Sequence, residues 1–95
     1  MKLVIKPSTK SDKKYMAVFY EGDKKVKTTH FGQAGADDYT ITKNKEQRDR
    51  YRTRHKKDLD TKDPTKAGYL SWFILWNKPT IKESIKDYKK RFNFT

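Results

Sequence analysis

The side chains best suited to chemistry form a basic run in the middle of the chain. Eight of the fifteen residues from Lys43 to Lys57 are Lys or Arg, and only Glu46 and Asp49 oppose them. Ammonium and guanidinium groups at this density suit the phosphates of a polyanion, which they bind through charge and hydrogen bonds. The run therefore predicts a nucleic-acid-binding surface made of Lys43, Arg48, Arg50, Arg52, Arg54, Lys56 and Lys57.

Helical spacing would sort these side chains onto different faces. Arg50, Arg54 and Lys57 follow one another at intervals of four and three residues, so a helix would present them on one side. Tyr51 and His55 are the neighbouring groups able to pack, and we expect them to face inward and hold the helix to the sheet. The alternative is a solvated helix with ion pairs four residues apart. Because two acids leave most of the charge unpaired, polyanion binding is favoured.

Aromatic and glycine residues offer two further candidate contacts. Tyr15, Tyr20 and Tyr39 could stack on the bases of a single strand, although strand aromatics more often pack in the core or across strands. The run His30–Gly35 has two glycines directly after a predicted strand, a spacing that can form a phosphate nest or a plain turn. It lacks the Lys-Ser/Thr pair of a phosphate loop, so the turn is favoured.

The material for catalysis is limited to two histidines and a few acids. The acids Asp37, Asp38, Asp58, Asp60 and Asp63 fall in predicted loops, where Asp commonly caps a helix or forms a turn. A metal nuclease needs carboxylates that converge from rigid elements. The chain has no Cys and therefore no thiolate. We expect no enzyme, with no catalytic residue, no metal site and no cofactor.

Composition describes one small and strongly basic domain, residues 1–95. The net charge is +12, from 24 Lys and Arg against 12 acids, so an anionic partner would relieve self-repulsion. Hydrophobic residues make up only 33%, but 6 Tyr, 5 Phe and 2 Trp carry enough area for a core. The apolar run near the start is too short for a signal peptide, and no segment is apolar enough to span a membrane. We therefore expect a protein that is not secreted and has no membrane partner.

The first third of the chain alternates with period two and predicts strands. Lys2–Lys6, Tyr15–Tyr20 and Lys25–Phe31 are short runs of apolar and β-branched residues separated by polar turns. Short connections of this kind favour antiparallel neighbours. The prediction is a three-stranded antiparallel β-meander over residues 1–31.

The rest of the chain predicts three α-helices, which complete an α+β fold: a basic helix over 44–58, a buried aromatic helix over 64–76 and an amphipathic helix over 80–92. Asn44 and Thr80 are suitable N-caps, each followed three residues later by Gln or Glu. Pro64 suits the first position of the second helix. Apolar side chains recur along the third helix at the spacing of one helical stripe.

The chain resembles a family of short basic proteins of unknown function encoded by giant nucleocytoplasmic large DNA viruses of algae and amoebae. The resemblance covers nearly the whole chain and departs from the family at Leu59–Lys62, where a tryptophan is common. It rests on Lys2–Ser8, Lys13–Phe19, Lys27–Gly32, Asp38–Thr40, Arg50–Tyr51, Arg54–Lys57, Asp63–Thr65, Ala67–Gly68, Leu75–Pro79, Ser84–Ile85, Asp87–Lys89 and Arg91–Phe92. It implies a viral setting and a shared fold, and it supplies no activity.

Together these features predict a nucleic-acid-binding protein. The expected partner is double-stranded DNA, or alternatively RNA, contacted through its phosphate backbone during packaging, condensation or maintenance of a viral genome. The expected location is the virion or the infected host cell, in a virus factory or the nucleus. The alternatives are a structural virion or capsid-associated protein that binds acidic protein surfaces, and a small nuclease. The sequence leaves the oligomeric state open.

Overall fold

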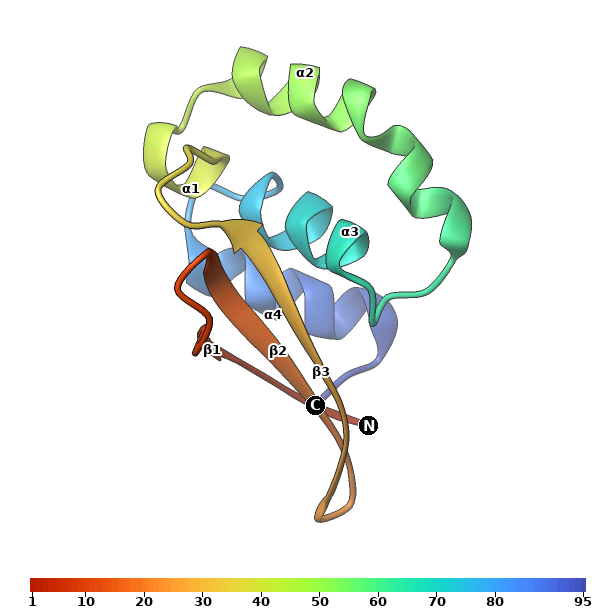
Figure 1. Ribbon diagram of the computed structural model, residues 1–95. Helices are drawn as coiled ribbons and strands as arrows, with labels where there is room; N and C mark the ends of the chain where they lie inside the picture. The colour runs from red at the N-terminus through yellow and green to blue at the C-terminus, as the bar shows by residue number, and fades with distance from the viewer.

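The N-terminal third forms an antiparallel sheet. The computed structural model describes all residues from 1 to 95 and pairs β1 (Lys2–Pro7), β2 (Lys13–Glu21) and β3 (Lys24–Gln33) in the order β1-β2-β3 (Figure 1). Helices make up most of the remaining chain. The predicted α+β class with a three-stranded antiparallel sheet is therefore confirmed.

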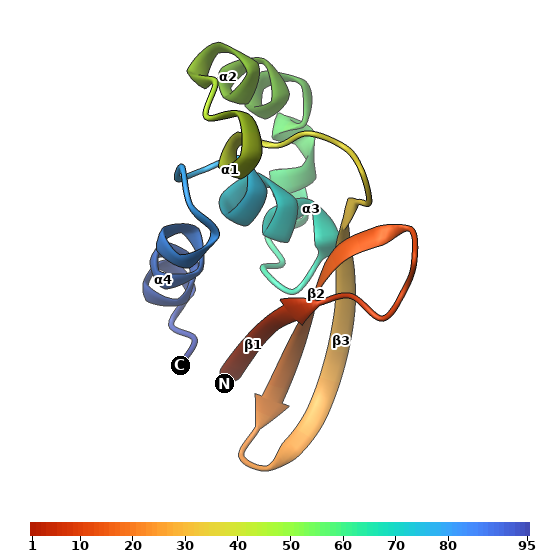
Figure 2. The ribbon, with the colours of Figure 1, turned by 90° about the vertical axis from the view of Figure 1, so that its left-hand side faces the viewer.

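The period-two pattern gives the sheet one face that packs against the core. Leu3 pairs with Phe19 across β1 and β2, and Tyr15 pairs with Phe31 across β2 and β3. Because side chains alternate along a strand, Leu3, Phe19 and Phe31 point to the same side and enter the core. The far end of the β2–β3 hairpin extends beyond the helices, and Lys24–Thr28 are exposed there (Figure 2).

The helical part differs from the three predicted helices, because the chain forms more and shorter segments. They are α1 (Tyr39–Thr42), α2 (Lys45–Arg54), the 3-10 helix η1 (Lys56–Thr61), α3 (Ala67–Leu70), the π-helix η2 (Ser71–Leu75) and α4 (Ile81–Phe92). The predicted amphipathic helix over 80–92 is confirmed as α4. Its Thr80 cap accepts a hydrogen bond from the Glu83 amide at 3.2 Å.

The predicted basic helix over 44–58 is wrong in its last four residues. The helix begins as expected, since the Asn44 side chain accepts a hydrogen bond from the Gln47 amide at 3.0 Å. It ends at His55, whose φ of −103° and ψ of 14° leave the α-helical region. The next turn is tighter, with the Asp58 amide donating to the His55 carbonyl three residues earlier, at 2.9 Å.

The predicted helix over 64–76 begins later and widens at its end. The Asp63 carboxylate accepts from the Thr65 amide at 2.9 Å and from its hydroxyl at 2.6 Å, which closes a turn instead of starting a helix. Helical structure begins only at Ala67. At the other end the Trp76 amide donates to the Ser71 carbonyl five residues back, at 3.2 Å, which is the hydrogen bond of a π-helix.

The short helix α1 was not predicted, and a buried acid fixes it. The Asp38 side chain is 2% exposed, accepts the Thr40 amide at 2.8 Å as an N-cap, and lies 2.5 Å from the Lys14 ammonium. The segment that leads to the basic helix is thereby tied to β2.

Helices α3 and η2 lie between α2 and α4 (Figure 1). One core cluster joins the buried face of the sheet to α3, η2 and α4, with Leu70, Ile74 and Tyr88 fully buried in it. Helix α2 lies on the other side of α3 and η2 from α4 (Figures 1 and 2). The expectation that Tyr51 faces inward is confirmed, but its ring packs on Trp76 at the end of η2 and does not hold the helix to the sheet.

Candidate nucleic-acid interface

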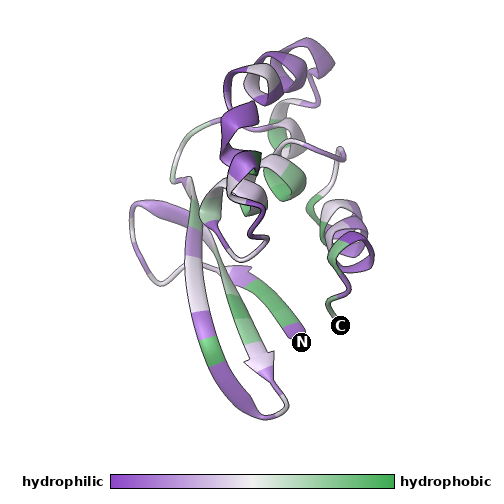
Figure 3. Cartoon of the chain, turned by 90° about the vertical axis from the view of Figure 1, so that its right-hand side faces the viewer, coloured by the Kyte–Doolittle hydropathy of each residue, from purple (hydrophilic) through white to green (hydrophobic).

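Helices α2 and η1 carry exposed and unpaired basic side chains. Lys45, Arg50 and Arg54 of α2 and Lys56 and Lys57 of η1 are all exposed, and no carboxylate lies within 4.0 Å of any of them. Figure 3 colours α2 as hydrophilic along most of its length, in contrast to the helices beneath it. Because α2 ends at His55, Arg50 and Arg54 lie in α2 whereas Lys57 lies in η1. The three side chains therefore do not form the continuous row that the helical spacing predicted.

Arg48 and Arg52 lie on the inner side of α2, where they pack on aromatic rings. The Arg52 guanidinium lies 3.8 Å from the centre of the Trp72 ring, and the Trp72 indole N–H donates to the Arg52 carbonyl at 3.3 Å. Arg48 lies 4.9 Å from the Tyr39 ring. Such cation–π contacts fasten a helix that has almost no apolar residue of its own.

The environment of Arg52 is costly for a charged group. Its Nε atom is buried without a hydrogen-bond partner. Burial, reinforced by the positive charge of Arg48, lowers the pKa of Arg52 below its ordinary value. Arg52 therefore positions α2, whereas the exposed Lys and Arg side chains of this helix are free to contact a ligand.

Lys43 ends α1 and precedes the basic helix. Its backbone adopts the left-handed conformation with φ of 54°, and its ammonium donates to the Thr40 carbonyl at 3.0 Å. The side chain is exposed at the N-terminal end of α2.

Three aromatic rings form a column through the junction of α2 and η2. The Tyr51 ring lies between His55, at a centroid distance of 4.2 Å, and Trp76, at 4.3 Å and an interplanar angle of 8°. Burial, followed by the charge of Asp58, raises the pKa of Tyr51. Stacking explains why this helix stays in place although none of its residues is fully buried.

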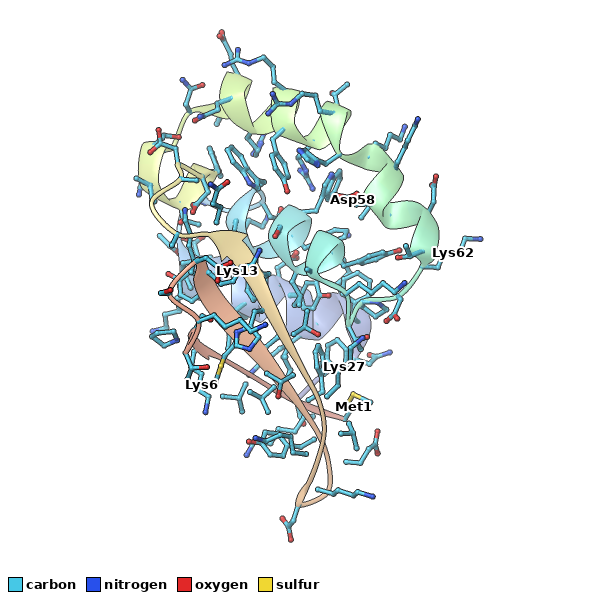
Figure 4. All side chains as sticks on the ribbon, viewed as in Figure 1. Met1, Lys6, Lys13, Lys27, Asp58 and Lys62 are labelled. Atoms are coloured by element: carbon cyan, nitrogen blue, oxygen red, sulfur yellow. The ribbon has the colours of Figure 1, made fainter.

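A cleft of about 400 Å³ lies between the end of the sheet, α2 and α3. Lys13 and Asp37 line it from the sheet side, and His55, Asp58 and Ser71 line it from the helices. Figure 4 shows Lys13 at the end of the sheet and Asp58 in the segment after α2. The His55 Nδ1 atom lies 3.4 Å from the Asp58 carboxylate.

Sequence reasoning missed this cleft because its residues come from distant parts of the chain. Lys13 precedes the basic helix by about thirty residues and Ser71 follows it, and neither carries a motif. The contact between η1 and α3 is close because Gly68 has no side chain; a Cβ atom there would lie 2.8 Å from the Asp58 Cβ. That glycine was the one available signal.

The run His30–Gly35 forms the turn that the sequence favoured. The Ala36 amide donates to the Gln33 carbonyl at 3.1 Å, and the His30 ring hydrogen-bonds the Ser8 hydroxyl at 2.7 Å. Gly32 has φ of 79° and lies against Leu75, where a Cβ atom would come within 2.8 Å of the leucine side chain. The glycine therefore serves close packing of β3 on η2.

The three tyrosines considered for base stacking mostly belong to the fold. Tyr39 is 4% exposed, and Tyr15 stacks on Phe31 at 6.0 Å. Tyr20 is half-buried on the outer face of the sheet, with the Lys2 ammonium 5.8 Å from its ring centre. Tyr15 and Tyr20, both half-buried, are thus the members of this set that a ligand can still reach.

The remaining acids and histidines stay dispersed. No three His, Cys, Asp or Glu side chains lie close enough together to hold a metal ion. No helix combines the length and the apolar character needed to cross a membrane.

Comparison with known proteins identifies a family whose function is unknown. Residues 3–55 match a family of unknown function, DUF5754. The matched region is more than half of the chain and runs from the first strand to the end of α2. No curated protein and no solved structure matches the chain.

Proposed function

The chain belongs to the DUF5754 family, whose function is unknown, and we propose that it binds nucleic acid through the phosphate backbone. One observation carries the proposal. Only three of the 24 Lys and Arg side chains, Lys14, Arg48 and Arg91, lie within 4.0 Å of a carboxylate. A surface with this much unpaired positive charge attracts a polyanion, and releasing the polyanion's counterions drives binding.

The contact surface we propose is the exposed side of α2 and η1. It comprises Lys43, Lys45, Arg50, Arg54, Lys56 and Lys57. A helix of ten residues is about 15 Å long. Helix α2 lies at one end of the molecule (Figure 1), and its Lys45, Arg50 and Arg54 are exposed. Arg48 and Arg52 belong to this interface indirectly, because they hold the helix in place.

Double-stranded DNA suits this surface better than double-stranded RNA. The major groove of B-form DNA admits an α-helix, whereas the major groove of A-form RNA is too deep and narrow for side chains to read. The resemblance to proteins of giant DNA viruses agrees with this choice. We therefore propose packaging, condensation or maintenance of a viral genome as the setting, in the virion or the infected cell.

Replacing Arg50, Arg54 and Lys57 together by Ala tests the proposal. We expect weaker binding to duplex DNA and a salt dependence of log K that is shallower by roughly one unit per lost phosphate contact. The melting temperature should hold or rise, because Ala favours helix and like-charge repulsion falls. Fluorescence anisotropy at two salt concentrations measures the first effect, and thermal melting measures the second.

The matched control replaces three exposed lysines of α4. Lys82, Lys86 and Lys90 carry the same charge and are also exposed. If their replacement by Ala weakens binding more than the α2 set does, the interface belongs to α4 and the proposed surface is wrong. If the parent protein binds acidic protein at high salt but not DNA, the structural-protein alternative replaces the proposal.

A further inference from the structure

The aromatic column at the end of α2 has one accessible end. Trp76, at the inner end, is 7% exposed, and Tyr51 is covered on both faces by its neighbours. His55, at the outer end, has a side chain that is 42% exposed. A planar group can therefore extend the column only by stacking on His55.

The surroundings of His55 suit a base flanked by phosphates. Arg54 and Lys56, its two neighbours in the chain, are exposed and unpaired, so phosphates can be held on either side of the ring. The cleft that His55 lines has a different charge balance, because Asp37 and Asp58 oppose Lys13 there. A phosphate gains little inside such a cleft, whereas an uncharged base can enter it.

The cleft also offers hydrogen-bond acceptors next to the stacking position. The Asp58 carboxylate lies 3.4 Å from the His55 ring and steadies it, and its exposed oxygens can accept from an exocyclic amino group. The volume of about 400 Å³ falls in the range of small-molecule sites. The amino group would come from adenine, cytosine or guanine.

We propose that His55 is a stacking platform for one unpaired nucleobase. The cleft receives this nucleobase, while the Lys and Arg side chains of α2 and η1 hold the adjoining phosphates. The proposal rests on the proposed nucleic-acid binding and adds a preference for a site with a flipped-out or single-stranded nucleotide. Stacking is tolerant of sequence because every base has a π-face.

The test compares a DNA duplex that carries a single-adenine bulge with the same duplex without the bulge. We expect the protein to bind the bulged duplex more tightly. His55→Ala should remove that preference, weakening binding to the bulged duplex by roughly 5- to 150-fold, the range for loss of one base–aromatic stack. Its affinity for the plain duplex should stay close to that of the parent protein.

His55→Phe separates stacking from charge. Phe keeps the ring but cannot be protonated or form an ion pair, so a stacking platform predicts that the preference for the bulge survives. If Phe loses the preference as completely as Ala does, His55 acts through its nitrogens and the inference is overturned. Thermal melting of both variants checks that the helix junction is intact.

A direct optical signal covers the case in which the Ala variant fails to fold. We expect 2-aminopurine placed in the bulge to lose fluorescence on binding the parent protein if it stacks on the ring, and unchanged or increased emission overturns the inference. Equal binding of both duplexes by the parent protein overturns the inference and leaves the proposed function intact. Failure to bind either duplex overturns both.

Discussion

At the scale of single residues, arginines of one helix have two different roles. Arg52 lies over an indole ring and Arg48 over a phenol ring, whereas Arg50 and Arg54 point to solvent. The difference follows from the helical period, since residues four apart share a face. The side chain that lacks any partner is available to a ligand, and the stacked one is part of the scaffold.

The buried pair of Asp38 and Lys14 is expected to be a critical structural contact. The aspartate caps α1 and accepts the lysine ammonium in a site where the two side chains are 2% and 13% exposed. Asp38→Ala should cost about 3–5 kcal/mol, because it leaves a buried charge unpaired and removes a cap. Chemical denaturation measures the loss.

Asp37→Ala is the control for this change. It removes the neighbouring carboxylate, which is exposed and makes no ion pair. A surface change of this kind should alter stability by no more than about 0.5 kcal/mol. Equal effects of the two variants would contradict a structural role for the buried pair.

Buried tyrosines should make the fold sensitive to alkali. Burial raises the pKa of Tyr88 above its ordinary value of 10.0, and its hydroxyl donates to the Pro64 carbonyl inside the core. Burial also raises the pKa of Tyr15 and of Tyr51. As the pH rises, the tyrosines of the unfolded chain therefore lose their protons before those of the folded protein. The contribution of these tyrosines to the free energy of unfolding is complete below about pH 10 and declines as the pH rises further.

Denaturant unfolding at about pH 9 and about pH 11 measures this decline. Tyr88→Phe lacks the titrating group, so its stability should fall less between the two pH values. A parent protein with the same stability at both values would contradict the expected pKa shifts.

At the scale of elements, local signals predicted some boundaries well and others poorly. Asn44 and Thr80 cap helices where expected, because a cap is a contact within one turn. The strands were also recognisable, because their alternating pattern involves only residues that are neighbours in the sequence. By contrast, α1 is only four residues long and depends on Lys14, which lies far away in the sequence.

In the candidate site, too, the sequence predicted some features and not others. Exposure of Arg50 and Arg54 follows from the charge pattern, but the inward positions of Arg48 and Arg52 do not. A hydrophobic pattern carries no signal for a guanidinium that packs on an aromatic ring contributed by η2 and α1. The stack of Tyr51 on Trp76 likewise brings together residues that are distant in the sequence.

The attachment of α2 should depend on one ring that directly follows η2. Trp76 is 7% exposed, belongs to the core cluster and supports the Tyr51 ring. Trp76→Ala should cost about 3–5 kcal/mol through lost burial and the cavity left behind. It should also increase hydrogen exchange in α2 more than in β2.

A contrasting position is Ile41, which is 59% exposed. Ile41→Ala should leave both the free energy of unfolding and the exchange pattern nearly unchanged. If Trp76→Ala is equally mild, the junction of η2 and α2 is not part of the core.

At the scale of the whole molecule, two groups of basic residues lie at opposite ends. The molecule measures 40 × 27 × 22 Å, with the basic helix at one end and the lysines of the β2–β3 hairpin at the other (Figures 1 and 3). A net charge of +12 on so small a body still repels itself and lowers stability. A bound polyanion would relieve that repulsion, which links the charge of the chain to its proposed ligand.

The most direct test of the central claim is the salt dependence of binding to duplex DNA. Backbone contacts release counterions, so log K should fall linearly with log salt concentration, with a slope of about −4 to −5 for about five phosphate contacts. Fluorescence anisotropy of a labelled duplex across a range of salt concentrations gives the slope. A flat dependence, or no binding at the lowest salt, would contradict the electrostatic account.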